Sequence, residues 1–133
     1  MRRVVLDTNI IISALLFGGN PRLILLKAIN GEMRLGMSPD LLRELREVLL
    51  RKKFNLTEQF VEMTIYEIEG LCDVVFPVNK VKVIDKDPDD DKILECALEY
   101  KADIIISGDE HILNLVSFHG IPILTSSQYL EYD

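Results

Sequence analysis

The sequence predicts an α/β protein in which helices cover a mostly parallel central sheet. Short apolar runs alternate along the chain with longer segments whose apolar residues recur at helical spacing. The run at residues 104–106 is three consecutive isoleucines, which is typical of a strand buried on both faces of a parallel sheet. The alternation continues along the chain without a repeat, linker or low-complexity segment. We therefore expect one domain that spans residues 1–133.

The individual elements follow from composition and from start and stop signals. The expected strands cover residues 4–6, 33–37, 74–78, 104–106 and 122–124, and residues 81–84 are also expected to be extended. The expected helices cover residues 10–17, 21–30, 38–53, 55–71, the segment after an acidic cluster as far as residue 100, residues 110–116, and a last helix from residue 126. Ser38-Pro39 is a cap followed by a first-turn proline, and Asn55-Leu56-Thr57-Glu58 resembles a capping box. Pro77 indicates an edge strand, because proline cannot donate a ladder hydrogen bond.

Composition and charge exclude several classes of protein. The 133 residues are 48% hydrophobic and 28% charged, as in ordinary globular domains. The net charge of -7 argues against a broad basic nucleic-acid-binding surface, but it does not exclude an enzyme that touches nucleic acid at one place. No apolar run approaches the ~20 residues of a membrane span, and the N-terminal run is too short for a signal peptide. We expect a cytoplasmic protein without a membrane partner, in which Cys72 and Cys96 are small buried hydrophobes.

Acidic residues follow two of the expected strands and fill one loop. Asp7 comes directly after residues 4–6, and Asp109 follows residues 104–106 after only two residues. The carboxyl ends of parallel strands meet at one edge of a sheet, so we expect these two carboxylates near each other. The loop Asp87-Pro88-Asp89-Asp90-Asp91 adds four more carboxylates directly before a helix.

The helical positions of the acids in that loop predict that they point in different directions. When residues are placed ~100° apart, the buried stripe of the following helix extends back onto Asp90. Asp91 then lies at the edge of the stripe, and Asp89 faces solvent. In the helix at residues 38–53, Glu44 borders the apolar stripe. Its role stays open, because pairing with a nearby basic residue is as consistent with the sequence as a functional role.

Several converging carboxylates need a compensating charge. A helix N-terminus stabilises one anion by only ~0.3–1 kcal/mol. Two like charges ~4 Å apart repel by roughly 4 kcal/mol at an effective dielectric of about 20. Protonation or a bound cation removes this repulsion, and Mg²⁺ or Mn²⁺ suits an all-oxygen site without His or Cys.

Four segments, in order, resemble the motifs of PIN domains, the nuclease domains of VapC-type toxins. The segments are Asp7-Thr8-Asn9-Ile10, Glu44, Asp90-Asp91-Lys92-Ile93-Leu94 and Ser107-Gly108-Asp109. Ser107 stands where threonine is commoner in this family. The consecutive aspartates leave the third acid between Asp90, which we prefer, and Asp91.

The resemblance implies a three-layer α/β/α sandwich and a Mg²⁺- or Mn²⁺-dependent endoribonuclease that cuts single-stranded RNA. It also implies the toxin of a toxin–antitoxin pair, with an antitoxin as partner and a homodimer as the usual assembly. The catalytic, metal-binding acids would be Asp7, Glu44, Asp90 and Asp109, supported by Thr8, Asn9 and Ser107. Candidate phosphate contacts are Arg43, Arg46 and Lys92. For the run at residues 51–53 the stronger interpretation is that it complements a helix dipole.

Two other classes of function remain as alternatives. In an Asp-based phosphatase or phosphoacceptor, Asp7 would be the nucleophile. However, Asn9 stands where phosphatases of the haloacid dehalogenase type have a second aspartate. In a non-catalytic binding module, the acidic pocket would hold a partner's Arg or Lys. We interpret His111, two residues after Asp109, as an exposed residue of a first helical turn, not as a metal ligand.

Overall fold

Six strands form one sheet in the order β3-β2-β1-β4-β6-β5. A computed structural model describes residues 1–81 and 88–132, and for residues 88–90 only the helical backbone. The strands are β1 (Arg3–Leu6), β2 (Arg34–Met37), β3 (Asp73–Val74), β4 (Ile104–Ile106), β5 (Ser117–Phe118) and β6 (Ile121–Leu124). Neighbouring strands are parallel except β5 and β6, which form an antiparallel pair. The predicted, mostly parallel sheet is therefore confirmed.

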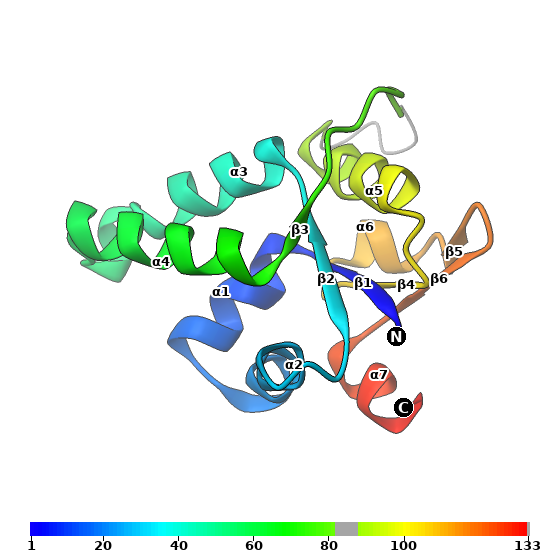
Figure 1. Ribbon diagram of the computed structural model, residues 1–133, viewed down its shortest axis with the longest axis horizontal. Helices are drawn as coiled ribbons and strands as arrows, with labels where there is room; N and C mark the ends of the chain where they lie inside the picture. The colour runs from blue at the N-terminus through cyan, green and yellow to red at the C-terminus, as the bar shows by residue number, and fades with distance from the viewer. Residues whose placement is uncertain (82–87, 133) are drawn as a thin grey trace.

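Helices cover both faces of this sheet. They are α1 (Thr8–Leu16), α2 (Gly19–Ile29), α3 (Pro39–Leu49), the 3₁₀ helix η1 (Lys52–Phe54), α4 (Glu58–Leu71), α5 (Pro88–Tyr100), α6 (Glu110–Leu113) and α7 (Ser126–Tyr132). Figure 1 shows α5 and α6 on one side of the sheet and α2 and α7 on the other. Contacts of α5 with β1 and β2, and of α7 with β6 and α2, agree with this view. The predicted α/β/α layering is confirmed.

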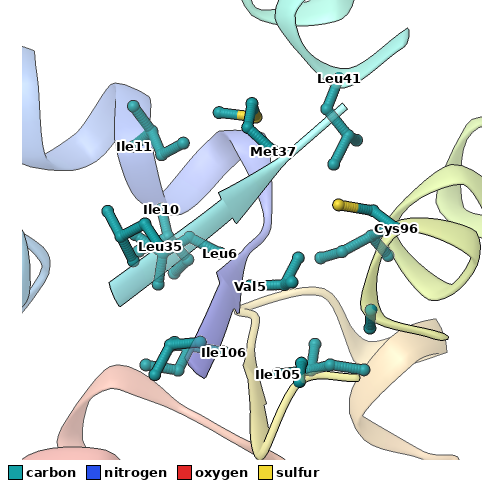
Figure 2. Packing of buried hydrophobic residues seen from close by; sticks show 14 of the residues in the cluster. Val5, Leu6, Ile10, Ile11, Leu35, Met37, Leu41, Cys96, Ile105 and Ile106 are labelled. Carbon is teal, nitrogen blue, oxygen red and sulfur yellow. The ribbon is translucent and has the colours of Figure 1, made fainter. Parts of the chain in front are cut away.

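The core is formed where the central strands meet these helices. Alternate residues of a strand point to opposite faces, so neighbours on β1 and β4 contribute to different layers. Figure 2 shows Val5 and Ile105 pointing toward α5, where Cys96 lies. All three side chains are fully buried. Burial raises the pKa of the Cys96 thiol to about 12, so this cysteine is a protonated, small apolar residue at neutral pH, as predicted.

Local elements differ from the sequence prediction at several turns. Asn55 does not begin the capping box; it ends η1 in the left-handed conformation, and Thr57 caps α4 by accepting a hydrogen bond from the Phe60 N–H. The strand β3 is only two residues long, although it lies at the sheet edge as Pro77 indicated. The helix α6 stops before Val116, which adopts a φ of 64°. The two-residue strand β5 was not predicted, because so short a segment carries no periodic pattern. Within the predicted extended segment 81–84, residues 82–84 lie outside the described residues.

No single helix among the described residues is long and apolar enough to cross a membrane. Only α1 and α2 taken together, across a 96° bend, reach the required length and composition.

Gly36 on β2 is required by the close approach of Tyr100 from α5. A Cβ built at position 36 would lie 2.3 Å from Cδ2 of the Tyr100 ring. The ring cannot move freely, because the Tyr100 hydroxyl donates a hydrogen bond to Asp73, which also pairs with Arg34. We therefore expect Gly36→Ala to lower the free energy of unfolding by about 1–3 kcal/mol, as overpacked cores do.

Urea unfolding of the purified variant measures this effect, and Gly70→Ala is the matched control. Gly70 lies in α4 with no atom within 4 Å of an added Cβ. There the substitution should stabilise the protein by roughly 0.5–1 kcal/mol, because alanine loses less conformational entropy in a helix. Equal effects of the two substitutions would show that the Tyr100 ring yields without cost.

Candidate active site

The site lies where the strand order reverses beside β1. The chain passes from β1 to β2 on one side, while β4 lies against the other side of β1 and leads on to β6. Leu6 pairs with Ile106, and the Asp7 N–H donates to the Ile106 carbonyl at 2.9 Å. Asp7 and the segment that starts at Ser107 therefore leave the sheet side by side. In open α/β sheets this switch point is the usual place for a ligand.

Each of the two aspartates caps a helix. The Asp7 Oδ1 accepts a hydrogen bond from the Asn9 N–H at 3.3 Å at the start of α1. The Asp109 Oδ1 accepts one from the His111 N–H at 2.7 Å at the start of α6. The N-terminal ends of two helices thus direct partial positive charge toward the same edge of the sheet, which favours anionic groups there.

Ser107 connects the two acids. Its hydroxyl donates to the Asp7 Oδ2 at 2.8 Å and accepts from the Asp109 N–H at 3.0 Å. Its side chain is completely buried, so water does not compete for these bonds. The sequence predicted Ser107 only as a supporting residue; the structure shows that one hydroxyl orients both acidic segments.

The environment of Asp7 disfavours its charged form. The residue is 8% exposed. Burial raises the pKa of the Asp7 carboxyl above its ordinary value, and the negative charge of Asp109 adds to the increase. Hydrogen bonds from Ser107, from the Asn9 N–H and from Thr8 act in the opposite direction without cancelling the effect. A bound cation would relieve this penalty directly.

An open depression of about 440 Å³ lies against this edge of the sheet. It is lined by Asn9, Ile10, Ser13, Gly108, Asp109, Glu110 and His111. Ser13 and Glu110 were not among the predicted site residues, and His111 was interpreted as an exposed residue of a first helical turn. Ser13 follows Asn9 by one helical turn on α1, and this spacing is the signal that would have identified it.

The remaining predicted acids lie on α3 and α5. Glu44 is half-buried on α3, which contacts both α1 and α5. Asp91 is only 7% exposed, so it lies deeper than the edge position that helical phase assigned to it. The side chains of Asp87, Asp89 and Asp90 lie outside the described residues.

The donor set fits a hard divalent cation in its chemistry. The carboxylates of Asp7 and Asp109 offer oxygen donors on segments that are held together, and burial disfavours the charged form of Asp7 in the absence of a counter-charge. Within residues 1–81 and 91–132, no three His, Cys, Asp or Glu side chains gather closely enough to hold a metal. A complete site would therefore need a further carboxylate, for which Asp90 is the predicted residue.

Two of the predicted phosphate contacts are engaged elsewhere. Arg43 pairs with Asp40 at 2.9 Å, and the Arg46 Nε pairs with Glu62 at 2.7 Å. These arginines are therefore charge-compensated on the surface of α3. Lys92 is half-buried on α5, in the turn that follows the acidic loop.

Comparison with known proteins identifies the family. No curated protein matches the sequence. The fold is similar to that of a chain in the crystal structure of VapBC2 from Rickettsia felis bound to a DNA fragment from their promoter. That match has a TM-score of 0.63 and 12% sequence identity, and it covers 92% of this chain and 98% of the other. The family model described as the PIN domain matches residues 3–111, and the chain therefore belongs to the PIN domain family.

Proposed function

We propose that this protein is a metal-dependent endoribonuclease that hydrolyses single-stranded RNA and acts as the toxin of a toxin–antitoxin pair. Membership of the PIN domain family supports a nuclease in general. The observation that carries the proposal is the Asp7–Ser107–Asp109 arrangement at the switch point of the sheet. The likeness to a chain of VapBC2 supports an antitoxin as partner. As in other VapC-type toxins, the assembly would be a homodimer.

The chain's own residues divide the work of hydrolysis. Asp7 and Asp109, joined by Asp90, would hold Mg²⁺ or Mn²⁺. Glu44 would have to approach them from α3, since it does not form a group with Asp7 and Asp109 among the described residues. The ion would supply Lewis-acid stabilisation of the charge that develops on the scissile phosphate. Ser107 keeps the Asp7 carboxylate in one orientation, and Thr8 assists it.

Proton transfer falls to a carboxylate at the same edge. Asp109, which is half-exposed at the depression, or Asp90 would accept a proton from the attacking water. Attack in line with the leaving oxygen would then produce a 5′-phosphate and a 3′-hydroxyl.

Cleavage of end-labelled single-stranded RNA by the purified protein tests the proposal. We expect fragments in Mn²⁺ or Mg²⁺, none in EDTA, and none from the Asp7→Asn/Asp109→Asn double variant. Glu58→Gln is the charge control, because it removes one exposed carboxylate at the start of α4 and should leave cleavage unchanged. Cleavage that persists in EDTA or in the double variant would contradict a metal nuclease at this site. Radiolabelled phosphate retained on Asp7 would instead favour the phosphatase alternative.

A further inference from the structure

A second pocket, of about 640 Å³, opens beside the acidic depression and shares Asn9 and Ser13 with it. Its other lining residues come from α1, from the residue that ends α1, and from η1: Ile12, Leu16, Phe17, Lys53 and Phe54. The volume lies in the range of about 300–1,000 Å³ that small-molecule sites occupy. Because the two pockets share lining residues, a continuous surface leads from Asp109 to Phe54.

The side chains of this Phe17–Phe54 pocket suit a flat apolar ring. Phe17 is 72% exposed, although phenylalanine is among the residues most often buried. Phe54 is half-buried, and the centroids of the two rings are 6.5 Å apart with an interplanar angle of 57°. Ile12 and Leu16 supply apolar wall. An aromatic face is thus left open to water beside a pocket whose wall on α1 is largely apolar.

A cation lies at the same pocket. The Lys53 Nζ is 5.1 Å from the centroid of the Phe54 ring, and its side chain is exposed. Over the part of the chain that the structure describes, no carboxylate forms an ion pair with Lys53, in contrast to Arg43 and Arg46. In a chain with a net charge of -7, this leaves a positive group next to an aromatic face and beside the catalytic acids. Aromatic faces combined with cations are how proteins bind single-stranded nucleic acid.

We propose that the Phe17–Phe54 pocket binds one unstacked nucleobase of the substrate, near the scissile phosphate. The base stacks on Phe17, and Lys53 contacts a backbone phosphate. The inference rests on the proposed nuclease function and deepens it, because a base inside a duplex is not free to enter such a pocket. The pocket would therefore account for a preference for single strands.

Fluorescence tests the stacking contact directly, because the sequence contains no tryptophan. In the Phe17→Trp variant, titration with a single-stranded RNA hexanucleotide in EDTA should quench the tryptophan emission. A hexanucleotide of abasic residues should not quench it. The control is Tyr66→Trp, since Tyr66 is 80% exposed on α4 and lines neither pocket. Equal quenching by both oligonucleotides, or in both variants, would overturn the proposal, and so would no quenching at all.

Fluorescence anisotropy of labelled RNA in EDTA measures how much the ring of Phe17 contributes to RNA binding, apart from its apolar bulk. Phe17→Ala should raise the Kd about tenfold to a hundredfold, as loss of base stacking does. Phe17→Leu keeps apolar bulk without a ring and should weaken binding to a similar extent. Unchanged RNA affinity in Phe17→Ala would overturn the proposal. If the oligomeric state or the binding of a protein partner changed at the same time, the pocket would be assigned to protein contacts.

The salt dependence tests the contact with phosphate. Lys53→Gln should reduce the slope of log K against log salt concentration by about 0.7, the value for one phosphate of a single strand. The matched control is Lys101→Gln, which removes an exposed charge in the turn before β4, at the opposite edge of the sheet. An equal change of slope in both variants would contradict a specific role for Lys53.

These readouts do not require catalysis, so the two proposals can fail separately. Base-dependent quenching without cleavage in Mn²⁺ would contradict the nuclease proposal and support the pocket. Cleavage in Mn²⁺ with unchanged affinity in Phe17→Ala would support the nuclease proposal and contradict the pocket.

Discussion

Replacing Asp7 with asparagine should abolish metal-dependent cleavage and, at neutral pH, raise the melting temperature of the metal-free protein. Asparagine still caps α1 by accepting a hydrogen bond from the Asn9 N–H, and its amide NH₂ would face the Ser107 oxygen and donate to it, which exchanges donor and acceptor in that bond. The substitution removes the desolvation of a buried carboxylate and its repulsion with Asp109, the two effects that raise the pKa of Asp7. The folded protein should therefore gain stability through the substitution. The rate of RNA cleavage should fall by more than about a hundredfold. Loss of a residue that merely orients a metal ligand already lowers metal affinity or activity about 10- to 100-fold.

The stability difference between Asp7→Asn and wild type should depend on pH. The folded-state pKa of Asp7 is raised above the ordinary 3.8, so the folded protein binds the proton more tightly than the unfolded chain. Wild-type stability therefore falls as pH rises from the unfolded pKa through the folded pKa, and it is constant above that window. The variant lacks this loss, so its advantage should grow across the window and then level off.

Thermal denaturation over a pH series, in EDTA and in millimolar Mg²⁺ or Mn²⁺, measures both effects. Metal should raise the melting temperature of the wild type and leave that of Asp7→Asn nearly unchanged. A metal-free Asp7→Asn variant less stable than wild type at pH 7 would show that the hydrogen bonds to Asp7 outweigh its desolvation.

Replacing Ser107 with alanine should lower the affinity for Mg²⁺ or Mn²⁺ about 10- to 100-fold, the usual effect of removing a group that orients a metal ligand. The substitution removes the donor to the Asp7 Oδ2 and the acceptor of the Asp109 N–H. Both acids would remain present, but neither would be held in place, and a partly buried N–H would lose its partner.

Ser107→Thr is the matched control for this prediction. It retains the hydroxyl and introduces the residue that is commoner at this position in PIN domains. Metal titrations followed by melting temperature, and the metal dependence of RNA cleavage, compare the two variants. Affinity that falls equally in Ser107→Ala and Ser107→Thr would indicate a packing effect at this fully buried position, not the loss of the bridging hydroxyl.

Much of the fold follows from local patterns. The apolar run at residues 104–106 forms the buried strand β4, and the capping signal at Ser38-Pro39 begins α3 where expected, with the Ser38 hydroxyl accepting from the Leu41 N–H. The errors occurred where local signals are weak or compete. Asn55 has the composition of a cap but adopts the left-handed conformation that ends η1, and the cap is Thr57 two residues later.

Part of the candidate site also follows from the sequence. The ends of two strands at Asp7 and Asp109 predict that two carboxylates share one edge of the sheet, and the charge of Asp109 is indeed close enough to contribute to the raised pKa of Asp7. Helical phase was less reliable at Asp91, which is buried where an edge position was expected. Helical phase predicts burial on the assumption that a helix packs one side against a single surface. By contrast, α5 contacts β1, β2 and α3, so more than one side of it is covered.

The sequence by itself determined most of the helices and the main strands, and which acids end the strands, because periodicity and capping depend on neighbours within a few positions. Only the tertiary structure decided that Ser107 donates to Asp7, a residue 100 positions away, because that contact depends on the pairing of Leu6 with Ile106. It also decided that Phe17 and Lys53 meet at one pocket beside the acids. Distances between remote segments arise from strand register and helix packing, and no local pattern encodes them.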